Sequence, residues 1–190
     1  DLAHGRQAAF WAETEPTLQA QWALIEVAGR LLAAAGRIAE EIPPRASSLD
    51  LLKRYTEGDA PWCLLDTHHR QMERRYHRLD PAPEQQEALE RLVTRARQRY
   101  MVVGARLAEA FVRAYSQDRF RTPGVLSQRE TFERVVGPCL KRGKVAYLLV
   151  DALRYEMARE LAQALAPEHE VTLEPAVALP PTITEIGMAA

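Results

Sequence analysis

Two side chains in the C-terminal part of the sequence have types and positions that could support chemistry on a phosphate ester. The first is Asp151, which directly follows the continuous apolar run of residues 145–150. Such a run is typical of a buried parallel strand, and ligands bind beside the carboxyl ends of strands in open α/β sheets. A carboxylate at that edge could bind a divalent metal. Asp151 could equally cap a helix beginning near Ala152, so its position leaves both roles open.

The second side chain is Thr184, within the segment Pro-Pro-Thr-Ile-Thr-Glu of residues 180–185. We expect Thr184 to be the N-cap of a new helix, where its hydroxyl lies beside free N–H groups and the positive end of the helix dipole. That environment suits a phosphate and a nucleophile that attacks one. Asp151 and Thr184 together could supply a metal-bound alkoxide. Threonine is also a common N-cap with no further role, and the residues alone favour that plainer role.

The elements that must position these residues fall into two unequal parts. Residues 1–142 are expected to form a helical domain, because apolar residues recur there at three- and four-residue steps. Residues 143–190 are expected to form the N-terminal portion of a parallel α/β domain. The expected fold class is therefore mainly α: a helical bundle followed by the first βαβ part of a truncated α/β sheet.

Proline, glycine and capping residues place the boundaries of the expected elements. Pro43-Pro44 ends the first helix, Ser47 or Ser48 begins the second, and Ser127 to Glu130 fits a capping box. The expected helices span residues 17–42, 47–58, 62–79, 84–116, 127–142 and 154–165, and the expected strands are residues 145–150 and 169–173.

The long helix over residues 84–116 carries an arginine stripe beside its apolar face. Three of its arginines, Arg95, Arg99 and Arg106, lack the acidic neighbour at helical spacing that Arg91 and Arg113 have. Arginines at near-constant angle could neutralise phosphates along a nucleic acid. A solvated outer face explains the same stripe, and we favour that interpretation because every surface helix needs a charged side.

Other polar residues could be read as metal ligands, with a plainer explanation for each. Asp66, His68 and His69 lie close together, but two ligands on one helix face without a third or fourth are weak evidence for a metal. A surface cluster explains them as well. Glu156 could point toward the same edge as Asp151 or interact with the dipole of its own helix. The three tryptophans are expected in core or interdomain packing.

Composition narrows the class of protein further. The 190 residues are 47% hydrophobic and 27% charged, with 25 Lys+Arg and 26 Asp+Glu, which argues against disorder and against a chain dominated by polyanion binding. Cys63 and Cys139 form no metal or redox motif, so two free thiols in a reducing, cytoplasmic compartment are expected. No apolar run is long enough for a membrane span. Because the sequence begins at Asp1 and ends in the opening of a helix, we expect a piece of a longer protein.

Two segments resemble a known family. Residues 145–156 read Val-Ala-Tyr-Leu-Leu-Val-Asp-Ala-Leu-Arg-Tyr-Glu, and residues 179–190 read Leu-Pro-Pro-Thr-Ile-Thr-Glu-Ile-Gly-Met-Ala-Ala. Together, at this separation, they resemble the PglZ domain of the alkaline phosphatase superfamily. The close similarity covers about residues 144–190. The helical part is more loosely similar to the region before that domain, around Tyr55, Trp62, Leu65-Asp66 and His69-Arg70.

The resemblance implies a fold, an activity and a partner set. The superfamily hydrolyses phosphate or sulfate esters on a doubly wound sheet, usually with two metal ions, often zinc. Asp151 matches its first metal-binding aspartate, and Thr184 matches the nucleophile that also bridges the metals, with Thr182 the less favoured choice. PglZ proteins belong to BREX-type phage defence, which implies other defence proteins as partners and leaves nucleic acid and an oligomer open.

The remaining superfamily ligands are Asp and His residues that follow the nucleophile. Asp151 and Thr184 are too few for a stable metal site by themselves. We therefore expect the parent protein to be a metal-dependent phosphoesterase, whether phosphatase, phosphodiesterase or nuclease, and the isolated chain to be inactive. The alternative is a non-catalytic helical module that docks partners or DNA.

Overall fold

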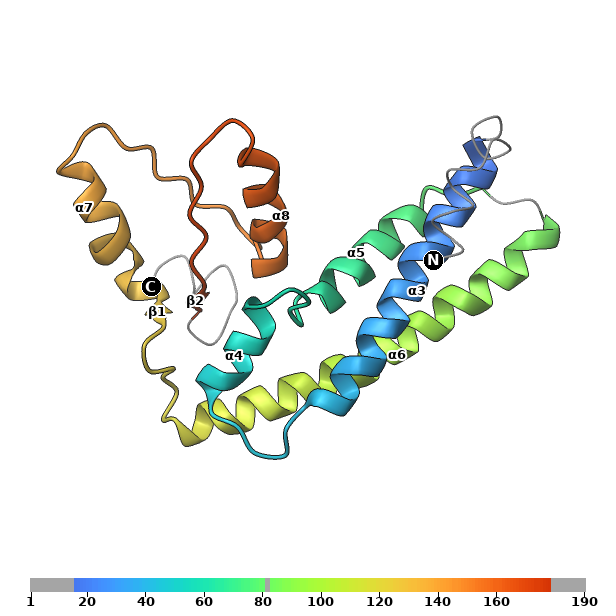
Figure 1. The fold of residues 1–190 in the computed structure, drawn as a ribbon, viewed down its shortest axis with the longest axis horizontal. Coiled ribbons are helices and arrows are strands. Elements are labelled where there is room, and N and C mark those ends of the chain that lie inside the picture. The colour runs from blue at the N-terminus through green and yellow to red at the C-terminus, as the bar shows by residue number, and fades with distance from the viewer. Residues whose placement is uncertain (1–15, 81–82, 179–190) are drawn as a thin grey trace.

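The structure is a computed structural model that describes residues 16–80 and 83–178. The fold is mainly α, as the sequence predicts. Four helices make up most of it, and in Figure 1 α3, α5 and α6 lie side by side while α4 packs against α6. The bounds of these helices are Pro16–Glu41 (α3), Ser48–Thr56 (α4), Leu64–Tyr76 (α5) and Pro83–Gln117 (α6).

The core of this bundle forms where the apolar faces of α3, α5 and α6 meet. The apolar face predicted for the long helix is confirmed, since Leu89, Val93, Ala96 and Val103 are all buried. Leu24, Leu31 and Ile38 of α3 and Leu65 and Met72 of α5 complete the same cluster. Burial of such stripes is the main stabilising contribution in a helical bundle.

The start of α4 is fixed by two polar contacts that the sequence only partly reveals. The Ser47 hydroxyl accepts a hydrogen bond from the Asp50 amide at 3.1 Å, and Asp50 accepts one from the Ser47 amide, which completes a capping box. The amide of Ser48 also donates to Asp118 Oδ2 at 2.9 Å, just beyond the end of α6. This second contact attaches the N-terminus of α4 to the far end of the long helix. Hydrogen bonds from the Ser48 hydroxyl and then from its amide hold the pKa of Asp118 below its usual range.

The C-terminal part begins with a short strand and a helix that changes its winding. Strand β1 (Leu126–Ser127) leads into a 3-10 turn (Gln128–Glu130), a π-helical turn (Phe132–Val136) and α7 (Gly137–Leu140). The capping box at Ser127 is confirmed, but the regular helix expected over residues 127–142 is not. Pro138 has no N–H group for the carbonyl four residues earlier, and the wider i to i−5 bond of Gly137 to Phe132 precedes it.

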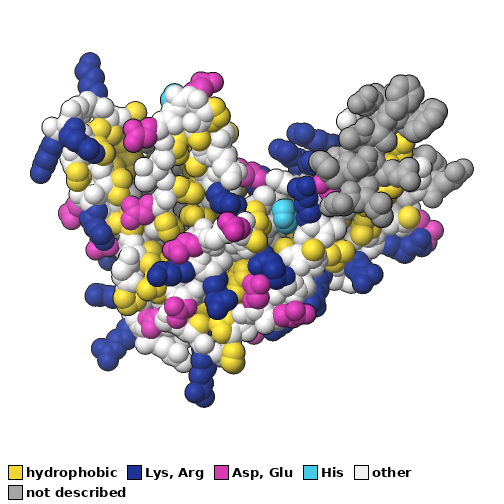
Figure 2. All heavy atoms as spheres, viewed as in Figure 1, with side chains coloured by type: hydrophobic (Ala, Val, Ile, Leu, Met, Phe, Trp, Pro, Cys, Tyr) yellow, Lys and Arg dark blue, Asp and Glu magenta, His cyan; other side chains and the backbone are white. Residues whose placement is uncertain are grey.

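The strand expected at residues 145–150 is wrong. Residues 144–150 form no helix or strand, and Leu148, Leu149 and Val150 are 81%, 70% and 58% exposed. A buried parallel strand needs neighbours on both edges, and within the described residues the only sheet pairs β1 with β2 (Ala176–Val177) in parallel. The second strand expected at residues 169–173 also does not form. The strand that the structure has in this region is β2, which lies further along the chain. Figure 2 shows hydrophobic side chains at the surface of this part of the molecule.

The last helix, α8 (Tyr155–Leu165), is close to the prediction of residues 154–165 and packs on α5. The pairing of Leu126 with Ala176 also joins residues on both sides of the expected boundary at 142/143, and that boundary stays a prediction. Among the helices that the structure describes, none is long and apolar enough to cross a membrane.

Candidate functional site

Asp151 lies in an exposed turn immediately before α8. The chain reverses there, because Ala152 adopts a positive φ of 54°. The N-cap of α8 is Arg154, three residues further on, so the interpretation of Asp151 as the cap of this helix is wrong. Asp151 is therefore held at the surface, within one short turn of the start of α8. Thr184 and Thr182, the proposed nucleophile and its less favoured alternative, lie outside the described residues.

Glu156 occupies the first turn of α8 and is almost completely buried. Its side chain has no exposed surface, and its carboxylate lies 2.8 Å from the Arg154 guanidinium in an ion pair. Neither oxygen accepts a hydrogen bond of good geometry. Burial raises the pKa of Glu156, and its own backbone amide and then the nearby Arg154 only partly oppose this shift. The position of Glu156 favours the interaction with its own helix dipole over a role at the edge beside Asp151.

Contacts from α5 hold α8 against the helical part of the molecule. Gln71 Nε2 donates to Glu160 at 2.9 Å, and Arg70 forms an ion pair with the same carboxylate. The hydroxyl of Tyr155 donates to the Thr56 carbonyl at 3.3 Å. Since Asp151 precedes α8 by so few residues, these contacts also limit where Asp151 can lie.

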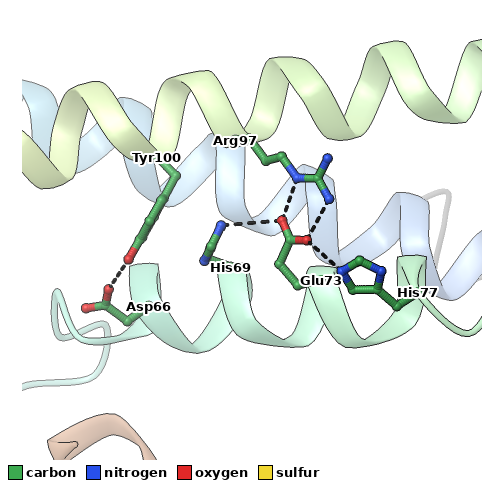
Figure 3. Close-up of polar contacts among 6 residues, drawn as sticks. All are labelled: Asp66, His69, Glu73, His77, Arg97 and Tyr100. Atoms are coloured by element: carbon green, nitrogen blue, oxygen red, sulfur yellow. Dashed lines mark hydrogen bonds and ion pairs between the residues drawn. The ribbon is translucent and has the colours of Figure 1, made fainter.

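A polar cluster runs along α5 where that helix faces α6 (Figure 3). The carboxylate of Asp66 accepts hydrogen bonds from the hydroxyls of Tyr55 at 2.8 Å and Tyr100 at 2.7 Å. The His69 ring stacks on the Tyr100 ring with centroids 3.8 Å apart. Burial, followed by the neighbouring Asp66, raises the pKa of both tyrosines, so both hydroxyls stay protonated donors.

One turn further along α5, Glu73 forms the centre of an ion-pair network. Arg97 of α6 donates to both of its oxygens, at 2.7 and 2.6 Å, and His69 and His77 lie 3.5 and 3.7 Å from it (Figure 3). Hydrogen bonding from Arg97 holds the pKa of Glu73 below its ordinary value. Burial lowers the pKa of His69 and outweighs the opposing charge of Glu73.

This geometry does not bring Asp66, His68 and His69 together around a metal. Asp66 faces the two tyrosines, and His69 faces Glu73. The Nδ1 atom of His68 is buried without a hydrogen-bond partner. Within residues 16–80 and 83–178, His, Cys, Asp and Glu side chains form no group of three that could hold a metal ion. The cluster therefore acts as a polar connection between α5 and α6.

This connection was not predicted from the sequence, although the spacing of its α5 residues indicated a shared helix face. Asp66, His69, Glu73 and His77 recur at three- and four-residue steps, which places them on one face of a helix. That face was not paired with Arg97 and Tyr100, because contacts between distant helices have no signature in the local sequence.

The arginine stripe of α6 divides into bonded and unbonded members. Arg91 forms an ion pair with Glu87, and Arg106 donates to the Ala39 carbonyl of α3 at 3.0 Å. Arg95 and Arg99 are exposed, and among the described residues neither makes a hydrogen bond or ion pair. Arg113 is also exposed and makes no hydrogen bond or ion pair with the described residues, so Arg95, Arg99 and Arg113 present unpaired guanidinium groups to solvent.

Comparison with known proteins identifies the C-terminal third of the chain. Residues 131–190 match a family model for an alkaline phosphatase-like domain. The matching model is that of the BREX system PglZ domain, and this confirms the resemblance found from the sequence for that segment. The matched segment contains Asp151, Thr184 and the whole of α8. No curated protein and no solved structure gives a significant match to the chain.

Proposed function

We propose that this chain is part of a PglZ-type metal-dependent phosphoesterase that acts in BREX-type phage defence. The observation that carries the proposal is the family match over residues 131–190, which includes both Asp151 and Thr184. The substrate class is a phosphate ester, cleaved as a phosphomonoester, a phosphodiester or a nucleic-acid backbone. The protein acts in the cytoplasm, with other proteins of the defence system as partners.

In this proposal Thr184 is the nucleophile and Asp151 is a metal ligand. The Thr184 oxygen would lose its proton and bond to phosphorus as the leaving group departs as an alcohol. Water would then cleave the threonine ester, releasing phosphate from a monoester substrate or a phosphomonoester from a diester. When bound, a divalent metal, zinc by resemblance, lowers the pKa of a hydroxyl and neutralises charge on the phosphate. The support for these roles is the agreement between the motifs around both residues and the matched family.

The donor set of the described residues does not fit a metal ion by itself. Asp151 has no two further ligands grouped with it in the part of the chain that the structure describes. Adding Thr184 gives two ligands, whereas catalytic zinc sites have three protein ligands and an open position. We therefore propose that the isolated chain is inactive and that the complete protein supplies the remaining ligands.

The helical part has a positioning role in this proposal. Arg70 and Gln71 of α5 bind Glu160 of α8, and α8 begins just after Asp151. Active sites require their ligands to be held by rigid surroundings, and a helix docked at two points on a bundle provides that rigidity. The bundle thus sets the orientation of the turn that carries Asp151.

Phosphodiester hydrolysis by this chain tests the proposed inactivity. Bis(p-nitrophenyl) phosphate is incubated with the chain and Zn²⁺ or Mn²⁺, with Thr184→Ala as the variant and Thr172→Ala as a matched threonine control. We expect no turnover from any of the three samples. Turnover that Thr184→Ala abolishes and Thr172→Ala retains would show that the chain is an enzyme in its own right.

A second candidate is a docking module for DNA, favoured by the exposure of Arg95 and Arg99 on α6. Binding of a duplex would depend on salt, because each neutralised phosphate releases counterions. The double change Arg95→Glu and Arg99→Glu should then weaken binding and flatten the salt dependence, while Arg91→Glu alters an arginine that is already paired. Unchanged affinity in the double variant would exclude the stripe as a DNA contact.

A further inference from the structure

An open groove between α4, α5 and α6 has the size and lining of a small-ligand site. Its volume is about 560 Å³, which lies within the range of roughly 300–1,000 Å³ that is typical of such sites. The walls are mostly apolar, and Asp66 is the one charged residue that lines the groove. Asp151 is not among the residues that line the groove, and binding in the groove does not depend on the proposed phosphoesterase chemistry.

The polar end of the groove holds the half-buried carboxylate of Asp66, which forms no ion pair within the described part of the chain. Each oxygen of Asp66 accepts one hydrogen bond, from the hydroxyl of Tyr55 or Tyr100, and each retains a further lone pair. No Lys, Arg or His among residues 16–80 and 83–178 forms an ion pair with Asp66. A carboxylate at the end of an apolar groove attracts a cation by charge, and a ligand N–H group could donate to its remaining lone pairs.

The apolar part of the groove has room for the rest of such a ligand. Gly104, Ala105 and Ala108 line it from α6, and a methyl group placed on Gly104 would meet no atom within 4 Å. From Tyr100 to Phe111 this side of the groove extends about 16 Å along the helix axis. The lining therefore combines one anionic end with an apolar channel.

From this arrangement we propose that the groove binds a small amphipathic organic cation. The ammonium or guanidinium group of the ligand lies at Asp66, beside the hydroxyls of Tyr55 and Tyr100. The apolar body of the ligand lies along Gly104 and Ala108. Charge complementarity selects the cation, and the limited volume selects a small molecule over a protein helix.

Calorimetric titration with octylammonium tests the site, with 1-octanol as the neutral probe of the same length. Octylammonium should bind at least about tenfold more tightly than 1-octanol, the factor expected from one charge-assisted contact. Asp66→Asn should reduce octylammonium binding to the level of 1-octanol, and Gly104→Leu should weaken both by about tenfold or more by filling the channel. The controls Asp80→Asn and Gly29→Leu make the same changes on exposed residues outside the groove and should bind as the unaltered chain does.

Several outcomes would overturn this proposal. One is equal affinity for octylammonium and 1-octanol, and another is binding that Asp66→Asn or Gly104→Leu leaves unchanged. A third is tight binding of a lysine-bearing apolar helical peptide of about twelve residues, three turns of helix, with no binding of octylammonium. Circular dichroism of each variant separates loss of binding from loss of folding, and Gly104→Leu is expected to fold because leucine favours helix over glycine.

Discussion

Glu156 offers the sharpest test of the energetics, because a carboxyl group with unsatisfied oxygens is buried in the first turn of α8. Its residue is 1% exposed, and neither oxygen accepts a hydrogen bond of good geometry. The Arg154 guanidinium lies 2.8 Å away, but its own side chain is 55% exposed and solvated. We predict that replacing Glu156 with methionine, an unbranched apolar side chain of similar length, stabilises the fold.

The magnitude follows from two opposing contributions. A buried polar group without a hydrogen bond costs about 1–3 kcal/mol. An ion pair to a mostly exposed arginine offsets roughly 0–1 kcal/mol of that cost. Glu156→Met should therefore raise the free energy of unfolding at pH 7 by about 1–2 kcal/mol, which corresponds to roughly 2–8 °C in Tm for a chain of this size.

The effect should depend on pH in a defined direction. Burial raises the pKa of Glu156 in the folded state, so the folded chain binds this proton more tightly than the unfolded chain. The stability of the unaltered chain then falls as pH rises from the unfolded pKa of about 4.3 through the raised folded pKa. Below the unfolded pKa the carboxyl is neutral in both states, and the advantage of Glu156→Met should shrink.

Chemical denaturation across pH 4–8 measures this, with the exposed Glu168→Met as the matched control. The control should change the free energy of unfolding by no more than about 0.5 kcal/mol. A loss of more than about 1 kcal/mol in Glu156→Met at pH 7 would refute the reasoning, because it would show that the carboxylate makes a stabilising interaction.

Three further predictions concern contacts between elements. Arg70→Ala and Glu160→Ala should show a coupling of about 0.5–1 kcal/mol in a double-mutant cycle, and additive effects would mean that their ion pair does not join α5 to α8. Glu73→Gln should lower the free energy of unfolding by about 1–2 kcal/mol at pH 7, because the carboxylate that accepts two hydrogen bonds from Arg97 is replaced by a neutral amide. The lowered pKa of Glu73 means that its contribution is present above the unfolded pKa and is lost as pH falls through the folded pKa, so equal losses at pH 7 and pH 3 would contradict it. Leu148→Asp should reduce light scattering of concentrated samples without changing Tm, since this leucine is 81% exposed, and a clear fall in Tm would show that it is packed.

The helical part of the fold could be predicted well because its information is local. Four features depend on short stretches of sequence, and each is confirmed: the apolar stripe of α6, the proline stop after α3, the helix start at Ser47 or Ser48, and the capping box at Ser127. The strand at residues 145–150 failed for the opposite reason. An apolar run records only a tendency to be buried, whereas a strand forms through pairing with a distant segment.

The residues of the candidate site show the same difference between features set by local sequence and features set by contacts between distant segments. Asp151 and Thr184 were found through their motifs, and both lie in the matched segment. The bonds from Tyr55 and Tyr100 to Asp66 were not predictable, because they join three helices whose arrangement depends on packing. Equally, nothing in the sequence indicated that Gly104 and Ala108 would leave a groove open beside that carboxylate.

Thr184 is the proposed nucleophile of a metal-dependent phosphoesterase. The most direct test is steady-state hydrolysis of bis(p-nitrophenyl) phosphate and of labelled DNA by the complete protein that contains this chain, before and after chelation of its metal. We predict metal-dependent turnover that Thr184→Ala abolishes and Thr182→Ala largely retains, with both variants folded. Turnover that survives Thr184→Ala, or a folded, metal-loaded protein that cleaves neither substrate, would contradict the account.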